Sequence, residues 1–136
     1  MKQARQLLTH IPERPVKPRK EGLTMVMDKG LSLREAEDFA ETGSEYVDFV
    51  KLGFGTSVIT PNVDKKIKAY HKAGMIVYFG GTLFEAFIIR GLFDKYVDLL
   101  KSAGVRMVEI SDGSYEFDHS EKLQYIRKLS KDFTVI

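Results

Sequence analysis

Residues 46–57 read Tyr46-Val47-Asp48-Phe49-Val50-Lys51-Leu52-Gly53-Phe54-Gly55-Thr56-Ser57, an apolar run followed by a segment with two glycines and two hydroxyl side chains. The run over 46–52 predicts a strand that is mostly apolar on both faces, as strands of a parallel sheet are. The glycines predict a loop over 53–57. Thr60-Pro61 comes next, and a proline at the first helical position favours a helix that begins there. This stretch therefore indicates a strand, a loop and a helix in succession.

The same succession recurs on both sides of this stretch. Ser32 and Glu35 form a capping box that predicts the start of a helix, and Gly43 is expected to end it. The centres of the expected strands recur every 24 to 30 residues, about the length of one strand, one helix and two loops. This alternation predicts an α/β fold with a parallel sheet. The other expected strands are 23–27, 75–79, 105–110 and 133–136, and the other expected helices are 61–73, 82–103 with a break near Gly91, and 121–131.

Two architectures contain such alternating units, an open doubly wound sheet and a (β/α)₈ TIM barrel. The first strand is followed by Asp28-Lys29-Gly30, which does not match the glycine-rich phosphate loop of a doubly wound dinucleotide-binding fold. Polar residues follow each strand instead, as they do at the catalytic end of a barrel. We therefore expect about the first four and a half units of a (β/α)₈ barrel over 23–136, preceded by a basic, proline-containing extension over 1–22.

Length and composition exclude several classes of protein. The 136 residues suffice for one domain, and 43% hydrophobic and 29% charged residues are typical of a globular chain. A net charge of +2 gives no argument for a nucleic-acid or membrane-surface partner. The absence of cysteine excludes disulfides, cysteine-ligated zinc and a thiol nucleophile. No apolar run approaches 18 residues and no secretory leader is visible, so a cytoplasmic protein is expected.

The N-terminal extension alternates prolines with basic residues. Two interpretations are open: the basic cluster grips a phosphate, or the segment is a solvated arm that lies on the domain, which is the usual meaning of a charge run. Asp48 stands early in its strand and is expected to form a structural pair. His10, His71 and His119 lie outside the strand ends, so surface or helix-face positions are expected for all three.

Cations, glycines and hydroxyl groups follow the expected strands. Lys29 and Lys51 stand at strand ends beside glycines, and a cation beside exposed backbone amides is a good anion trap. Gly80-Gly81-Thr82 precedes a helix, whose first amide groups are free to bind an anion. Each glycine has a second interpretation, a turn that needs its backbone freedom. The residues expected to bind substrate are Asp28, Gly53, Gly55, Thr56, Ser57, Gly80, Gly81, Thr82 and Ser111.

Carboxylates form a second set. Glu109 stands within an apolar strand, where an unpaired charge would be costly, so it is expected to face the barrel mouth or to pair with a lysine. Glu85 and Asp112 stand near other strand ends. Oxygen ligands without cysteine or histidine partners suit Mg²⁺, which takes one or two carboxylates and fills its shell with water and substrate oxygens.

Four segments in order resemble phosphosulfolactate synthases: 27–30, 48–57, 80–85 and 108–114. The likeness extends over about 14–136. It implies a Mg²⁺-dependent (β/α)₈ lyase that adds sulfite to phosphoenolpyruvate, giving (2R)-3-phosphosulfolactate, a reaction of coenzyme M biosynthesis. It implies catalytic roles for Lys29, Lys51 and Glu109, with the two lysines binding anions. It also implies that Glu109, Asp112 and Glu85 bind the metal ion.

The resemblance also raises a question about completeness. In the family, the fifth strand runs into a Glu-Val-Gly-Lys-type segment with a candidate proton-donor lysine, and this sequence stops at Ile136, before that segment. Three hypotheses follow: a synthase that needs a missing C-terminal half or a partner, a non-catalytic module that binds phosphorylated anions, and a structural half-barrel. The last would self-associate through unpaired edges at 23–27 and 133–136.

Overall fold

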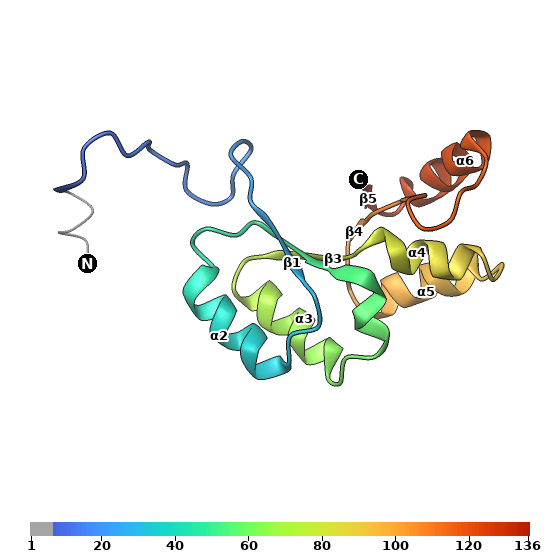
Figure 1. The fold of residues 1–136 in the computed structure, drawn as a ribbon, viewed down its shortest axis with the longest axis horizontal. Coiled ribbons are helices and arrows are strands. Elements are labelled where there is room, and N and C mark those ends of the chain that lie inside the picture. The colour runs from blue at the N-terminus through green and yellow to red at the C-terminus, as the bar shows by residue number, and fades with distance from the viewer. Residues whose placement is uncertain (1–6) are drawn as a thin grey trace.

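The computed structural model describes residues 7–136 and contains one parallel sheet with helices between its strands. The strands pair in sequence order, β1-β2-β3-β4-β5, and every pairing is parallel. The predicted α/β class and parallel sheet are therefore confirmed (Figure 1). The strands are β1 (Met25–Asp28), β2 (Phe49–Leu52), β3 (Ile76–Phe79), β4 (Met107–Val108) and β5 (Thr134–Val135). The helices are α2 (Leu33–Gly43), the 3₁₀ segment η1 (Gly53–Val58), α3 (Val63–Lys72), α4 (Gly81–Ile88), α5 (Phe93–Ser102) and α6 (His119–Leu129).

Local signals account for most helix boundaries. The capping box forms as predicted: the Glu35 amide donates to Ser32 Oγ at 3.3 Å, and the Ser32 amide donates to Glu35 Oε2 at 2.8 Å. The long helix predicted over 82–103 is interrupted where expected, because Gly91 has a φ of 66°. The predicted start at Pro61 is wrong. Helix α3 begins at Val63, because Asn62 has left-handed backbone angles that cannot continue a helix.

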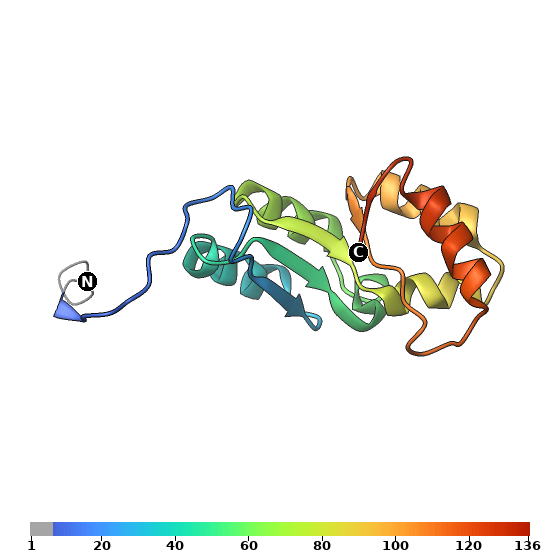
Figure 2. The ribbon, with the colours of Figure 1, turned by 90° about the horizontal axis from the view of Figure 1, so that it is seen from above.

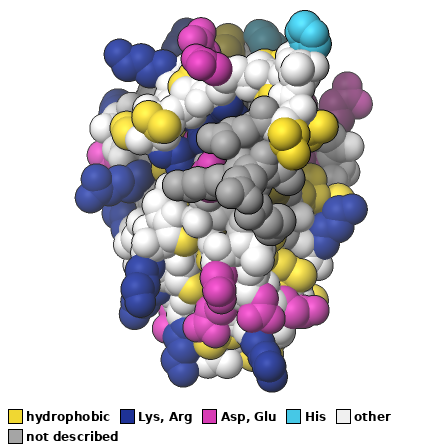
Figure 3. All heavy atoms as spheres, turned by 90° about the vertical axis from the view of Figure 1, so that its left-hand side faces the viewer, with side chains coloured by type: hydrophobic (Ala, Val, Ile, Leu, Met, Phe, Trp, Pro, Cys, Tyr) yellow, Lys and Arg dark blue, Asp and Glu magenta, His cyan; other side chains and the backbone are white. Residues whose placement is uncertain are grey.

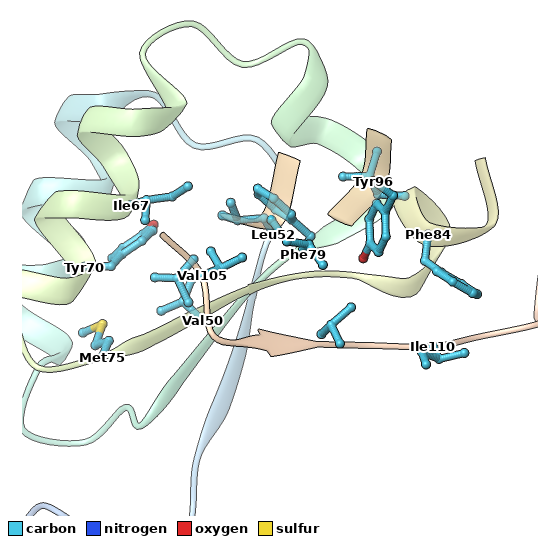
Figure 4. Packing of buried hydrophobic residues seen from close by; sticks show 14 of the residues in the cluster. Val50, Leu52, Ile67, Tyr70, Met75, Phe79, Phe84, Tyr96, Val105 and Ile110 are labelled. Carbon is cyan, nitrogen blue, oxygen red and sulfur yellow. The ribbon is translucent and has the colours of Figure 1, made fainter. Parts of the chain in front are cut away.

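One hydrophobic core lies on one face of the sheet. Alternate strand residues such as Val50, Val77 and Val108 are fully buried in it. Figure 4 shows Val50 in this core with Tyr70 of α3 and Tyr96 of α5. Helices α2 to α6 all contribute to this cluster. Helices α2 and α3 lie side by side below the first three strands (Figure 1).

The opposite face of the sheet is open over much of its area. Met25, Met27 and Ile76 point to this face, by their alternation with core residues, and are 49%, 38% and 47% exposed. The expectation of strands covered on both faces is therefore met on one face only. Strands β1 and β5 form the two edges of the sheet, seen from above in Figure 2. None of the helices within 7–136 has the length and apolar character needed to cross a membrane.

Candidate functional site

The carboxyl ends of β2, β3 and β4 bring a lysine, a helix N-terminus and a carboxylate together. Lys51 Nζ lies 2.7 Å from Glu109 Oε1 and 2.6 Å from Oε2. Glu109 Oε2 also accepts a hydrogen bond from the Gly81 amide, at the first residue of α4, over 3.0 Å. The Lys51 and Glu109 side chains remain 18% and 23% exposed. A cation, an anion and a helix N-terminus therefore meet at one solvent-accessible point, as the strand-end argument predicted for Lys51 and Glu109.

The two glycines at the start of α4, Gly80 and Gly81, make this approach possible. A Cβ at Gly80 would lie 2.9 Å from Lys51 Cε and 3.2 Å from the Leu52 carbonyl oxygen. A Cβ at Gly81 would overlap the Ser111 side chain. Neither glycine has a positive φ. Close packing, not a turn geometry reserved for glycine, therefore explains why both positions lack a side chain. Thr82 follows as the second residue of α4.

Lys29 lies at the same end of the sheet but against η1. Its Nζ is 5.8 Å from the centre of the Phe54 ring, a cation–π distance. Phe54 is exposed and has a φ of 53°, a left-handed conformation that is uncommon for a residue with a bulky side chain. The structure thus places Lys29 beside a strained aromatic residue rather than in the Lys51–Glu109 ion pair.

The segment η1 holds four of the residues expected to bind substrate. Gly53 packs against Met27, with a Cβ at Gly53 only 2.7 Å from Met27 Cγ. Thr56 Oγ1 donates to the Gly53 carbonyl at 2.8 Å, and Gly55 has a φ of 68°. Among residues 7–136, Ser57 Oγ is a buried hydroxyl without a hydrogen-bond partner. The segment is therefore a tight cap on the end of β2, and its role in substrate binding stays a prediction.

Asp28 is buried beneath the loop that carries Lys29. Its Oδ1 accepts hydrogen bonds from the Gly30 and Leu31 amides, both at 2.8 Å. Its Oδ2 lies 2.9 Å from Lys66 Nζ and accepts a hydrogen bond from the Tyr70 hydroxyl, also at 2.9 Å. Burial alone would raise the pKa of Asp28, but these donors outweigh it and hold the pKa below its usual value. The structure therefore places Asp28 among loop-holding contacts, not on the exposed rim where a substrate ligand was expected.

Glu85 has a comparable position beneath a second loop. It is buried in α4 and accepts hydrogen bonds from the Ser111 hydroxyl, the Gly113 amide and the Ser114 amide. The Ser114 bond is 2.7 Å long. Glu85 was expected to bind the metal and Ser111 to bind the substrate. The structure brings the two side chains together, and their contact orders the loop after β4.

Asp112, the third expected metal ligand, is half-exposed and pairs with Lys122 of α6 at 2.9 Å. The three carboxylates do not gather: within 7–136 no three His, Asp or Glu side chains form a group that could hold a metal ion. Glu109 alone of the three stands beside Lys51.

The basic residues of the N-terminal extension bind the amino-terminal side of the sheet. Arg19 pairs with Asp48 at 2.8 Å, and Arg14 lies 3.7 Å from the same carboxylate. Lys17 donates to the carbonyls of Ser44 and Val47. These contacts favour the interpretation of an arm that lies on the domain, with Asp48 in a structural pair. Figure 3 shows this end of the molecule, where side chains of both charge signs are spread over the surface.

Sequence reasoning missed three residues near this end of the sheet. Lys66 and Tyr70 are one helical turn apart on the buried side of α3, so a lysine on an apolar helix face was an available signal. Tyr78 stands in β3 between apolar residues, so no polar pattern marked it. Burial and the nearby Glu109 charge raise the pKa of Tyr78 to about 12.

Comparison with known proteins identifies the family. A family model described as (2R)-phospho-3-sulfolactate synthase (ComA) matches residues 12–136. The chain belongs to this family. The resemblance noted in the sequence is therefore confirmed, over nearly the whole chain.

Three relatives illustrate the match, and each is named phosphosulfolactate synthase. The protein of Methanocaldococcus jannaschii is 41% identical over 109 residues, which are 79% of this chain and 43% of that protein. That of Bacillus subtilis is 33% identical over 126 residues, 93% of this chain and 50% of that protein. That of Methanothermobacter thermautotrophicus is 39% identical over 117 residues, which are 85% of this chain and 45% of that protein. The chain thus spans about half the length of the relatives it matches.

Proposed function

We propose that this chain carries part of the active site of a phosphosulfolactate synthase, a lyase that adds sulfite to phosphoenolpyruvate to give (2R)-3-phosphosulfolactate. Family membership supports the proposal. The observation that carries it is the placement of Lys51 beside Glu109 and the N-terminus of α4, at the carboxyl edge of a parallel sheet. Active sites of barrel enzymes lie at this edge.

The chemistry suits these groups. The sulfur of sulfite forms a bond to the methylene carbon, the double-bond electrons move onto the carboxylate as an enolate, and a proton then adds to the adjacent carbon. Lys51 and the Gly81 amide supply positive charge where the anionic substrate binds. Glu109 holds the Lys51 ammonium group at a fixed place. Lys29, on the neighbouring loop, would bind a second anionic group.

The proposal includes Mg²⁺, and Glu109 is the expected ligand that lies on the partly exposed edge beside Lys51. To bind the ion, it would exchange contacts with Lys51 and the Gly81 amide for it. Its carboxylate is partly exposed, and Mg²⁺ commonly takes only one or two protein carboxylates. Asp112 is exposed enough to serve through a bridging water, whereas the buried Glu85 carboxylate is already filled by three donors. The ion, when bound, would stabilise negative charge on the substrate carboxylate.

The topology supports a partial (β/α)₈ barrel as the scaffold. A doubly wound sheet reverses its strand order at a switch point and carries helices on both faces. Here the order is sequential and helices α2 to α6 share one core on one face. The open face, with Met25, Met27 and Ile76, would become the barrel interior when further strands close it.

The test measures binding and turnover in the same samples. Calorimetric titration of this chain with phosphoenolpyruvate in Mg²⁺ is expected to show binding that Lys51→Met weakens at least tenfold, while Lys65→Met, an exposed lysine of α3, has no effect. Sulfite-dependent loss of phosphoenolpyruvate is then followed. Absence of any binding contradicts the proposal.

The second candidate function, an anion-binding module without turnover, needs only the cation and the helix N-terminus that the structure brings together at this edge of the sheet. Binding that depends on Lys51, without loss of phosphoenolpyruvate, would identify this candidate. Turnover would show instead that a complete site assembles from this chain.

A further inference from the structure

Tyr78 lies on the face of the sheet that carries Lys51, opposite the hydrophobic core. In the sheet, Tyr78 is directly flanked by Lys51 of β2 and Met107 of β4. Side chains alternate along a strand, and Val77 and Phe79 belong to the core cluster whereas Tyr78 does not. Tyr78 and Lys51 are therefore neighbours on the open face, where the proposed active site lies.

Glu109 completes this group. It follows Met107 by two residues, so it projects to the same face, and it forms the ion pair with Lys51. Tyr78 is only 2% exposed, which fixes the direction of its ring. A phenolic hydroxyl keeps its proton at neutral pH. It is a neutral hydrogen-bond donor beside a cation and an anion.

We propose that the Tyr78 hydroxyl donates a hydrogen bond to the carboxylate of the three-carbon acid bound at this site. The inference rests on the proposed function and names the group that would contact one end of the substrate. Tyr78 lies three residues before Gly81, toward the middle of the sheet. Lys51 is level with Tyr78 in the sheet, but its ammonium group extends to Glu109, which contacts the N-terminus of α4 at the rim. Several donors at that rim suit a phosphate dianion. A ligand with a carboxylate at one end and a phosphate at the other would then meet hydrogen-bond donors at both ends.

A neutral donor is well suited to the carboxylate end. The enolate charge of the proposed reaction develops on this carboxylate, and a fixed donor stabilises that charge more than it stabilises the starting carboxylate. The hydroxyl adds this stabilisation without placing a second cation next to Lys51.

The test compares two ligands, phosphoenolpyruvate and inorganic phosphate, by calorimetric titration of this chain with Mg²⁺. Tyr78→Phe removes one oxygen and keeps the shape of the ring. It is expected to weaken phosphoenolpyruvate binding about tenfold or more, as the loss of a hydrogen bond to a charged group does, and to leave phosphate binding within about twofold. Tyr46→Phe, an exposed tyrosine at the other end of the sheet, is the matched control and should change neither.

Each outcome of these titrations supports or overturns the proposed role of the Tyr78 hydroxyl. Retained phosphate binding by Tyr78→Phe shows that the variant is folded, so a selective loss of phosphoenolpyruvate binding supports the inference. Equal binding of phosphoenolpyruvate by Tyr78→Phe and the unaltered chain overturns it and leaves the proposed function standing. An equal loss for both ligands overturns it as well, because the hydroxyl would then serve the phosphate or the fold. Failure of the unaltered chain to bind either ligand removes the proposed function and this inference together.

Discussion

Replacement of Lys66 by methionine is expected to lower the free energy of unfolding at pH 7 by about 3 to 5 kcal/mol. Lys66 Nζ lies 2.9 Å from Asp28 Oδ2 and donates to the Leu31 carbonyl at 2.7 Å, and the Lys66 and Asp28 side chains are each 1% exposed. Methionine fills a similar volume without charge, so Asp28 loses its counter-ion where water cannot replace it. The total free energy of unfolding of a natural domain is about 5 to 15 kcal/mol, so this loss is a large part of it.

Urea unfolding followed by far-UV circular dichroism measures this loss. Lys65→Met, the exposed neighbour on α3, is the control and should lie within about 0.5 kcal/mol of the unaltered chain. The double variant Asp28→Asn, Lys66→Met should regain much of the stability, because removal of both charges costs less than isolation of one. The double variant also keeps the test valid if Lys66→Met does not fold.

The pH dependence gives a second readout. The folded-state pKa of Asp28 is depressed, so its contribution to stability is present above the unfolded-state pKa and is lost as the pH falls through the folded value. Without Lys66 the folded-state pKa of Asp28 rises, so the stability that this group loses on acidification should shrink or reverse, because protonation then relieves an unpaired buried charge. If Lys66→Met costs less than about 1 kcal/mol and leaves the acid-side profile unchanged, the reasoning from a buried ion pair is refuted.

Two further predictions concern close packing and the N-terminal arm. Gly81→Ala should destabilise the chain by about 1 to 3 kcal/mol in urea unfolding, because the new methyl group overlaps the Ser111 side chain. The control is Gly113→Ala, whose methyl group meets no atom within 4 Å and should have little effect. Equal losses of stability in the two variants would contradict this packing. Burial would raise the pKa of Asp48, but the Thr24 amide and Arg19 outweigh it and lower the pKa, so stability from this group is lost on acidification. Asp48→Asn should therefore flatten the profile of thermal midpoint against pH below about pH 4, and an unchanged acid limb would exclude this role.

Local patterns in the sequence were sufficient to predict the succession of strands and helices. The capping box at Ser32 and the break at Gly91 act within one turn of chain, so their signals are readable without the fold. Strand ends could be aligned because parallel strands bring their carboxyl ends to one edge, which predicted that Lys51 and Glu109 lie at the same edge of the sheet. The start of α3 was misplaced because the left-handed backbone of Asn62 has no distinct sequence signal.

The sequence by itself determined the class of fold, the family resemblance and the edge of the sheet where polar groups gather, because these follow from periodicity and from short motifs. Only the tertiary structure decided which charged groups pair. Lys51 and Glu109 are 58 residues apart, and Asp28 and Glu85 stand at strand and helix positions that looked equally suited to a ligand. Burial and the donors around each carboxylate separate them: Asp28 and Glu85 are enclosed and hold loops, whereas Glu109 remains open to solvent beside Lys51. Those surroundings come from chain segments that are distant in sequence, so no local pattern encodes them.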